Sequence, residues 1–143
     1  LLPARPTIAT PLDADFGDSV RLLSVDVPAT AKRGESITVT WTFEARGKVG
    51  AGWKMFVHAQ GPNRAMTING DHRPTRPFEW WKPGQFVRYT TQLSIPRSAQ
   101  HGTFTILAGM FKGNTRARAT MAKGPFGPAD KDAVPVGRFE VVP

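Results

Sequence analysis

The chain has 143 residues, the size of a single domain, and its 40% hydrophobic content is enough to build a core. It has no cysteine, which excludes disulfides, thiol catalysis and cysteine-ligated metals, and it has no apolar run of the roughly 18 residues that a membrane span needs. Nineteen Lys and Arg against eleven Asp and Glu give a net charge of +8, which favours anionic partners or simply a solvated basic surface.

Residues 1–18 are predicted to be an arm or linker, because Pro3, Pro6 and Pro11 punctuate a polar stretch that cannot form a helix. The first residues lack a basic segment followed by a long apolar one, so we expect no signal peptide here. The chain also begins without Met, and we expect a processed product or part of a longer protein. The folded domain is predicted to cover residues 19–143.

Alternation of apolar and polar residues predicts strands. In residues 36–44, Ile37, Val39, Trp41 and Phe43 share one face and polar residues share the other. Residues 86–95 and 102–111 alternate in the same way, whereas residues 53–60 are apolar on both faces in their middle, as in a central strand.

Weaker strands are predicted at residues 20–27, 64–68, 116–122 and 134–142, with Gly, Pro and Asn-Gly turn signals between them. No segment of useful length has a helical period. Seven to nine short strands predict an all-β fold, a single antiparallel β-sandwich that is Ig-like or jelly-roll-like.

Catalytic and metal-binding patterns find little support. The histidines His58, His72 and His101 accompany no Gly-x-Ser-x-Gly elbow and no Ser/His/Asp grouping, so we predict no enzyme. A metal site built from His58, Asp71 and His72 is weakened because neighbours in a strand point to opposite faces. The acidic run at 13–18 places Gly17 where a calcium loop needs an oxygen ligand. We therefore predict neither a metal nor a cofactor.

The segment Asp71–Gly84, DHRPTRPFEWWKPG, concentrates aromatic and charged residues. One interpretation is a ligand-binding loop, with flat aromatics including Trp53 stacking on sugar rings and nearby charged groups binding hydroxyls. The other is that Trp81 anchors the loop at the end of the sandwich while Trp80 is partly exposed. Asp71 and His72 are predicted to structure the loop. The candidate ligand-binding residues are Trp80, Trp81, Arg73, Arg76 and Glu79.

A basic segment follows the strand at 102–111. If it is one strand, Arg116 and Arg118 fall on the same face and form a cationic ridge. A nucleic-acid groove would need stacking aromatics interleaved with this ridge, and these are scarce, so we predict a partner-facing basic edge rather than nucleic-acid binding. The predicted partner-facing residues are Arg116, Arg118, Lys112 and Lys123.

The order of short motifs carries a resemblance. FGDSVRLLSVDV, GESITVTWTFEA, KMFVHAQG, NGDHRPTRPFEWWKPGQFV, LSIPRSAQHGTFTILAGMF and VPVGRFEVV follow one another over most of residues 16–142. This order resembles the C-terminal soluble β-sandwich of bacterial polytopic glycosyltransferase-like membrane proteins of the dolichyl-phosphate-mannose mannosyltransferase type. Gln85 departs from the acidic residue usual there, and no catalytic motif is present.

The resemblance implies an extracytoplasmic, membrane-proximal accessory sandwich in the periplasm or at the cell surface. Two functions stay open. One is a non-catalytic binding module that contacts an acidic or neutral glycan. The other is a structural subunit or domain, held by a protein partner in a membrane-associated assembly through its basic face and its N-terminal arm.

Overall fold

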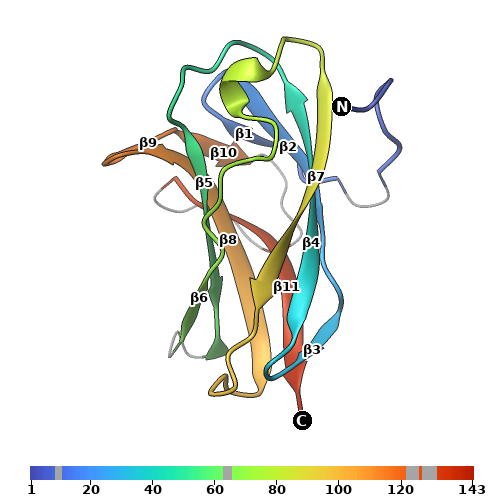
Figure 1. The fold of residues 1–143 in the computed structure, drawn as a ribbon, viewed down its shortest axis with the longest axis vertical. Coiled ribbons are helices and arrows are strands. Elements are labelled where there is room, and N and C mark those ends of the chain that lie inside the picture. The colour runs from blue at the N-terminus through green and yellow to red at the C-terminus, as the bar shows by residue number, and fades with distance from the viewer. Residues whose placement is uncertain (9–10, 63–65, 122–125, 127–131) are drawn as a thin grey trace.

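The computed structural model describes residues 1–8, 11–62, 66–121, 126 and 132–143. Two β-sheets pack face to face (Figure 1). The five-stranded sheet contains, in spatial order, β10 (Ala119–Met121), β1 (Ala14–Phe16), β2 (Val20–Asp26), β4 (Ser36–Ala45) and β7 (Phe86–Ser94). The six-stranded sheet contains β3 (Thr30–Lys32), β11 (Val134–Val142), β8 (Gly102–Lys112), β5 (Lys54–Gln60) and β6 (Thr67–Asn69), with β9 (Thr115–Arg116) paired to β8.

The predicted two-sheet β-sandwich is confirmed, but two of its details are wrong. The described residues form eleven strands instead of seven to nine. β1 and β3 are too short to show a period, and two strands, β9 and β10, replace the single strand predicted at residues 116–122. The pairing is also not purely antiparallel. After β2 the chain changes sheets, and β3 pairs in parallel with β11.

Alternation placed the long strands correctly. In β4, Ile37, Val39, Trp41 and Phe43 are all buried, with exposures of 6% or less. In β5 the three central residues Met55–Val57 are buried on both faces, as expected of a central strand that lies between β8 and β6. A glycine or proline turn follows most of these runs, so each strand ends where the backbone must turn.

The predicted arm contributes a strand to the sandwich. Residues 14–16 form β1 between β2 and β10, and Leu12, Ala14 and Phe16 are buried in the core. Asp13 and Gly17, with φ angles of 51° and 60°, turn the chain at either end of β1. Nearer the N-terminus, the backbone N–H of Leu2 donates to the Phe86 carbonyl at 2.8 Å, so the arm runs beside the start of β7.

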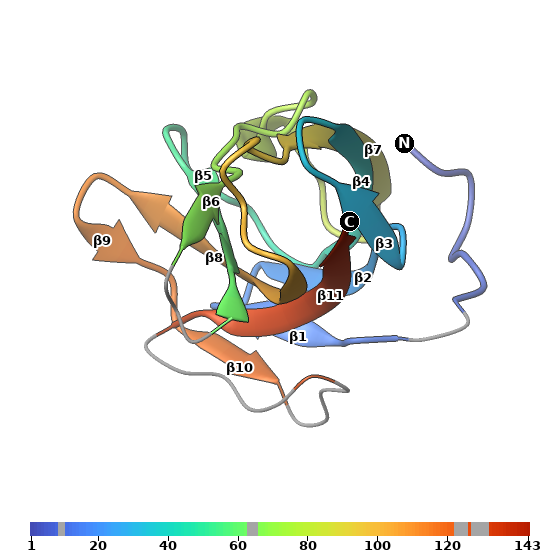
Figure 2. The ribbon, with the colours of Figure 1, turned by 90° about the horizontal axis from the view of Figure 1, so that it is seen from below.

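Aromatic rings fill the space between the sheets. Phe43 contacts the rings of Phe78, Trp81 and Tyr89, with centroid separations of 5.3 to 6.2 Å. Phe104 stacks on a second ring, from β11, at 5.4 Å. Figure 2, viewed along the strands, shows both sheets curving around this interior. In the described part of the chain no helix is long and apolar enough to cross a membrane.

Candidate functional site

The loop between β6 and β7 is anchored at the end of the sandwich. It carries the single-turn 3-10 helix η2 (Phe78–Trp80), seen at the top of Figure 1. Phe78 and Trp81 are buried at 0% and 2% exposure, and the Trp81 indole Nε1 donates to the Arg76 carbonyl at 2.8 Å. Trp81 is therefore placed as the anchor and is not open to a ligand at the surface, because its ring lies in the core. Trp80 is 59% exposed.

Of the other candidate residues of this loop, Arg73 and Glu79 pair with each other. The Arg73 Nη2 donates to Glu79 Oε2 at 3.2 Å. Arg76 Nε and Glu79 Oε1 are buried without a hydrogen-bond partner in the described structure. Neither of the two cavities described below is lined by any of these side chains, and the large hydrophobic group that the loop exposes is the Trp80 ring.

Asp71 and His72 tie the loop to β5 and point in opposite directions. Asp71 Oδ1 accepts a hydrogen bond from the Val57 backbone N–H at 2.7 Å. The His72 backbone pairs with Met55, and its ring lies 2.7 Å (Nε2) from the Tyr89 hydroxyl. Burial lowers the pKa of His72 from its ordinary value, so the neutral ring is favoured. These contacts hold the loop in place, the role expected of both residues.

The three candidate metal ligands do not converge. His58 Nε2 lies 3.5 Å from Asp71 Oδ1 on the outer face of the six-stranded sheet. His72 instead packs toward the interior, with its ring 5.2 Å from that of Trp41. Among the described residues, no group of three or more His, Cys, Asp or Glu side chains is close enough to hold a metal ion.

His58 and Asp71 instead form one wall of a polar hollow, which we call the cup. It has a volume of about 310 Å³ and opens on the outer face of the six-stranded sheet, where β9 folds back beside the end of β8. Its lining comes from β5, from the loop after β6 and from the β8–β9 hairpin. The seven residues are Phe56, His58, Asp71, Phe111, Gly113, Asn114 and Arg116.

The wall of the cup depends on a glycine in β8. Phe56 points outward yet is only 4% exposed, because its ring covers Gly109 of the neighbouring strand. A Cβ on Gly109 would lie 2.3 Å from the Phe56 Cζ atom. On its other side the ring is covered by Arg116, whose guanidinium carbon lies 4.3 Å from the ring centroid. The Phe111 ring stands 6.3 Å from the Phe56 ring. This cation–π contact helps to hold the guanidinium at the cup.

The sequence predicts roles for only some of the residues that line the cup. His58 and Asp71 are candidate metal ligands and Arg116 is a candidate partner-facing cation, whereas no pattern marks Phe56, Phe111 or Asn114 as site residues. Phe56 counted as core because β5 is apolar on both faces. A usable signal was present in the glycine inside β8, since a glycine in a strand often marks the close approach of another group.

The predicted cationic ridge does not form. Arg116 ends β9 in the six-stranded sheet, whereas Arg118 lies just before β10, which belongs to the five-stranded sheet. The chain changes sheets between the two residues, so they do not share a strand face. The Lys112 side chain packs near Gly52, and Lys123 lies outside the described residues.

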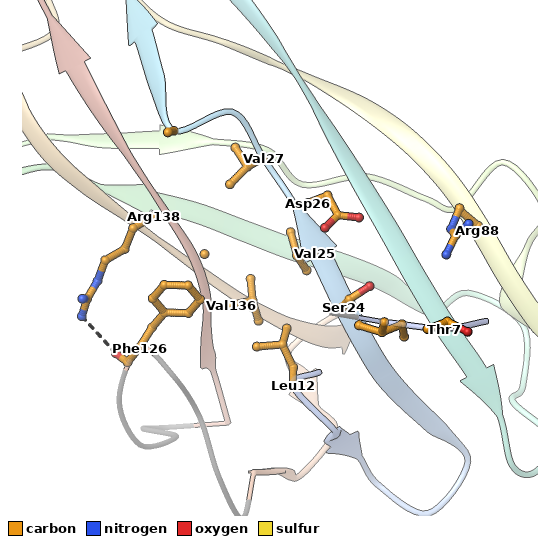
Figure 3. Close-up of a pocket in the computed structure, with 13 residues that line it drawn as sticks. Thr7, Leu12, Ser24, Val25, Asp26, Val27, Arg88, Phe126, Val136 and Arg138 are labelled. Carbon is orange, nitrogen blue, oxygen red and sulfur yellow. Dashed lines mark hydrogen bonds between the residues drawn. The ribbon is translucent and has the colours of Figure 1, made fainter. Parts of the chain in front are cut away.

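A second, larger hollow of about 410 Å³ lies between the N-terminal arm, β2 and β11 (Figure 3). Its floor is formed by valines, including Val25 and Val136. Arg88 and Arg138 line its margins and make their own hydrogen bonds, to Thr42 Oγ1 at 3.0 Å and to the Phe126 carbonyl at 3.2 Å. Thr7, Ser24 and Asp26 add polar groups to its lining. We take the cup as the candidate ligand site because the His58–Asp71 pair, Asn114 and Arg116 line it beside two phenylalanine rings.

Comparison with known proteins finds a similar fold but no similar sequence. No protein-family model and no curated protein sequence matches the chain. Among solved structures, the chain is similar to a Niemann-Pick type C2 protein from Japanese carpenter ant, with a TM-score of 0.52 and 9% sequence identity over 77% of this chain and 93% of that one. At this identity the likeness supports a shared β-sandwich fold and nothing further about function.

Proposed function

We propose that this domain is a non-catalytic, extracytoplasmic binding module and that the cup is where it contacts a saccharide. The observation that carries the proposal is the convergence of two aromatic rings, a His58–Asp71 pair and Arg116 in one hollow built from three separate segments. Concave sites with a few converging polar groups and apolar walls are the usual form of small-ligand sites.

The groups in the cup suit a polyhydroxylated ligand. The carboxylate of Asp71 accepts hydrogen bonds, the guanidinium of Arg116 donates them, and the amide of Asn114 does both. The Phe111 ring offers apolar surface to the C–H face of a sugar. The described lining holds one carboxylate, Asp71, and lacks the second carboxylate that glycoside hydrolysis uses. This absence from the cup supports binding over hydrolysis.

The test is saccharide binding followed by amide NMR. Ligands found on a glycan array should shift the amides of Gly113 and Asn114, and the Asn114→Ala variant should weaken binding by about fivefold or more while the fold is kept. Gln60→Ala is the matched control, because Gln60 faces outward on the same strand as His58 but does not line the cup. Equal affinity in both variants would show that the ligand binds elsewhere.

A second candidate function, a domain docked in a membrane-associated assembly, is favoured by the exposed Trp80. An indole with 59% exposure at one end of the sandwich is suited to burial against a protein partner. The order of motifs supports a placement beside a glycosyltransferase-like membrane part. Co-purification from the native membrane that is lost in Trp80→Ala but kept in Asn114→Ala would favour this function over the first. Sequencing the gene upstream of Leu1 would show whether a membrane part precedes it.

A further inference from the structure

We infer that the ligand class of the cup is a neutral saccharide, bound through neighbouring hydroxyl groups on a single ring, rather than an acidic one. This inference rests on the proposed function. It runs against the net charge of +8, which alone favours an anionic ligand. The reason lies in which charges line the cup.

The fixed charges at the cup are balanced. Its lining holds one carboxylate, Asp71, and one guanidinium, Arg116, together with the imidazole ring of His58. A ligand carboxylate bound here would lie close to the Asp71 carboxylate, and like charges in contact repel strongly. Lys54, Arg73 and Lys112 lie within two residues of the lining along the chain but do not line the cup, and cations farther than about 8 Å away are largely screened at physiological ionic strength. The two charges that contact a bound ligand are therefore Asp71 and Arg116, and this balanced pair disfavours a ligand with a net charge.

Both charged groups are held in place before a ligand arrives. Asp71 Oδ1 accepts from the Val57 N–H at 2.7 Å and lies 3.5 Å from His58 Nε2. A carboxylate has about four lone-pair sites, so Asp71 can accept a ligand hydroxyl in addition to these contacts. The guanidinium carbon of Arg116 lies over the Phe56 ring, 4.3 Å from its centroid, and this contact helps to hold the cation at the cup.

An acceptor and a donor fixed in the same small hollow match two adjacent hydroxyl groups. One hydroxyl donates to Asp71 and its neighbour accepts from Arg116. Ionised partners make such hydrogen bonds shorter and stronger than neutral ones. The volume of about 310 Å³ is at the low end of the range of about 300–1,000 Å³ for ligand sites, which fits one sugar ring at a chain end better than an extended oligosaccharide.

The experiment uses matched pairs of probes. The affinities of the methyl glycosides of glucose, galactose and mannose are measured by amide NMR titration at physiological salt. They are compared with those of the methyl glycosides of the corresponding uronic acids, which carry a free carboxylate at C6. We expect at least one neutral member to bind about tenfold tighter than its uronate. Its 2-deoxy or 3-deoxy analogue should bind more weakly than the parent.

The variant Asp71→Asn separates charge from structure, because the amide oxygen can still accept from the Val57 N–H. It should weaken binding of the neutral glycoside by about tenfold to a hundredfold and remove the discrimination against the uronate. Asp26→Asn is the control, since Asp26 is an exposed carboxylate on β2, in the other sheet. This variant should leave both affinities unchanged.

The outcomes separate the two proposals. If the uronates bind more tightly, and the Arg116→Gln variant loses that binding, the cup is a saccharide site but the neutral class is overturned. If no probe of either kind shifts the amides of the cup, the proposed function fails together with this inference. Tighter binding of a neutral glycoside that survives Asp71→Asn would also overturn the inference, because the carboxylate would then not contact the ligand.

Discussion

An alanine at position 109 tests the geometry on which the cup depends. In the structure, a Cβ at this position would lie 2.3 and 2.4 Å from two ring carbons of Phe56 and 2.6 Å from the Asp132 carbonyl oxygen. Non-bonded heavy atoms prefer separations of about 3.5–4.0 Å, so the overlap is on the order of 1 Å. The Phe56 ring can tilt away by rotation of its side chain, but the Asp132 carbonyl belongs to the backbone. Removing both overlaps therefore requires a shift of the main chain as well.

We expect Gly109→Ala to lower the free energy of unfolding by about 2–3 kcal/mol, the upper part of the range for overpacking. Urea denaturation followed by tryptophan fluorescence measures this as a lower midpoint with an unchanged slope. Gly50→Ala is the control, because nothing lies within 4 Å of a Cβ built there. It should change stability by less than about 0.5 kcal/mol.

A double-mutant cycle assigns the cost to the ring. Phe56→Leu removes the ring atoms that the new Cβ meets but leaves the Asp132 carbonyl in place. The double variant should therefore recover part of the loss, with a coupling energy of about 1 kcal/mol. The reasoning is refuted if Gly109→Ala matches the wild type within about 0.5 kcal/mol, or if the cycle shows no coupling, since either result means that Phe56 does not cover β8.

Three further predictions concern the fold. Burial lowers the pKa of His72 below its ordinary value of 6.5, so the unfolded chain takes up this proton more readily than the folded chain. The free energy of unfolding should therefore fall as the pH drops below 6.5, and His72→Gln should make this fall smaller in urea titrations at stepped pH. An equal fall in the variant would contradict this. Trp81→Ala should lower the free energy of unfolding by about 3–5 kcal/mol in urea denaturation, because the Trp81 ring is buried. Trp80→Ala should lower it by less than about 1 kcal/mol, because the Trp80 ring is exposed. Similar losses in both variants would mean that Trp81 is not the anchor of the loop. Deleting residues 1–6 should lower the free energy of unfolding by about 1 kcal/mol. Deleting residues 1–16 also removes β1, and it should abolish the cooperative unfolding transition measured by circular dichroism. A cooperative transition in the longer deletion would show that β1 is dispensable.

The strands that alternation predicts well are those with one face in the core. β4 and β8 each place four or more apolar residues at alternate positions, and packing against the opposite sheet rewards that pattern. β1 has only three residues and is flanked by turns at Asp13 and Gly17, so composition there reads as an arm. β3 is held by parallel pairing with β11, a contact between segments more than a hundred residues apart that no local window contains.

The cup is harder to predict than the strands because it depends on registers between segments. The sequence brings His58 and Asp71 together only in a metal hypothesis that includes His72, and it weakens that hypothesis because neighbours in a strand point to opposite faces. In the structure the His58–Asp71 pair lies on the outer face, and His72 lies inside beside Tyr89. Arg116 reaches the cup because the chain turns back at Gly113, whose φ of 58° suits glycine, and not because of its own strand period.

The packed interior bears on where any ligand of this sandwich binds. Trp41, Phe43 and Phe104 have no exposed surface, and Trp81 has 2%. Displacing one such ring into water exposes about 150–250 Å² of apolar surface and costs about 4–6 kcal/mol. A micromolar ligand gains only about 8 kcal/mol in total, so moving even two rings would exceed that gain. A ligand that binds between the described parts of the two sheets would therefore have to displace these core rings, because they fill the interior. The outer faces and the loops remain for binding, and there the cup unites fixed polar groups with apolar walls in one hollow.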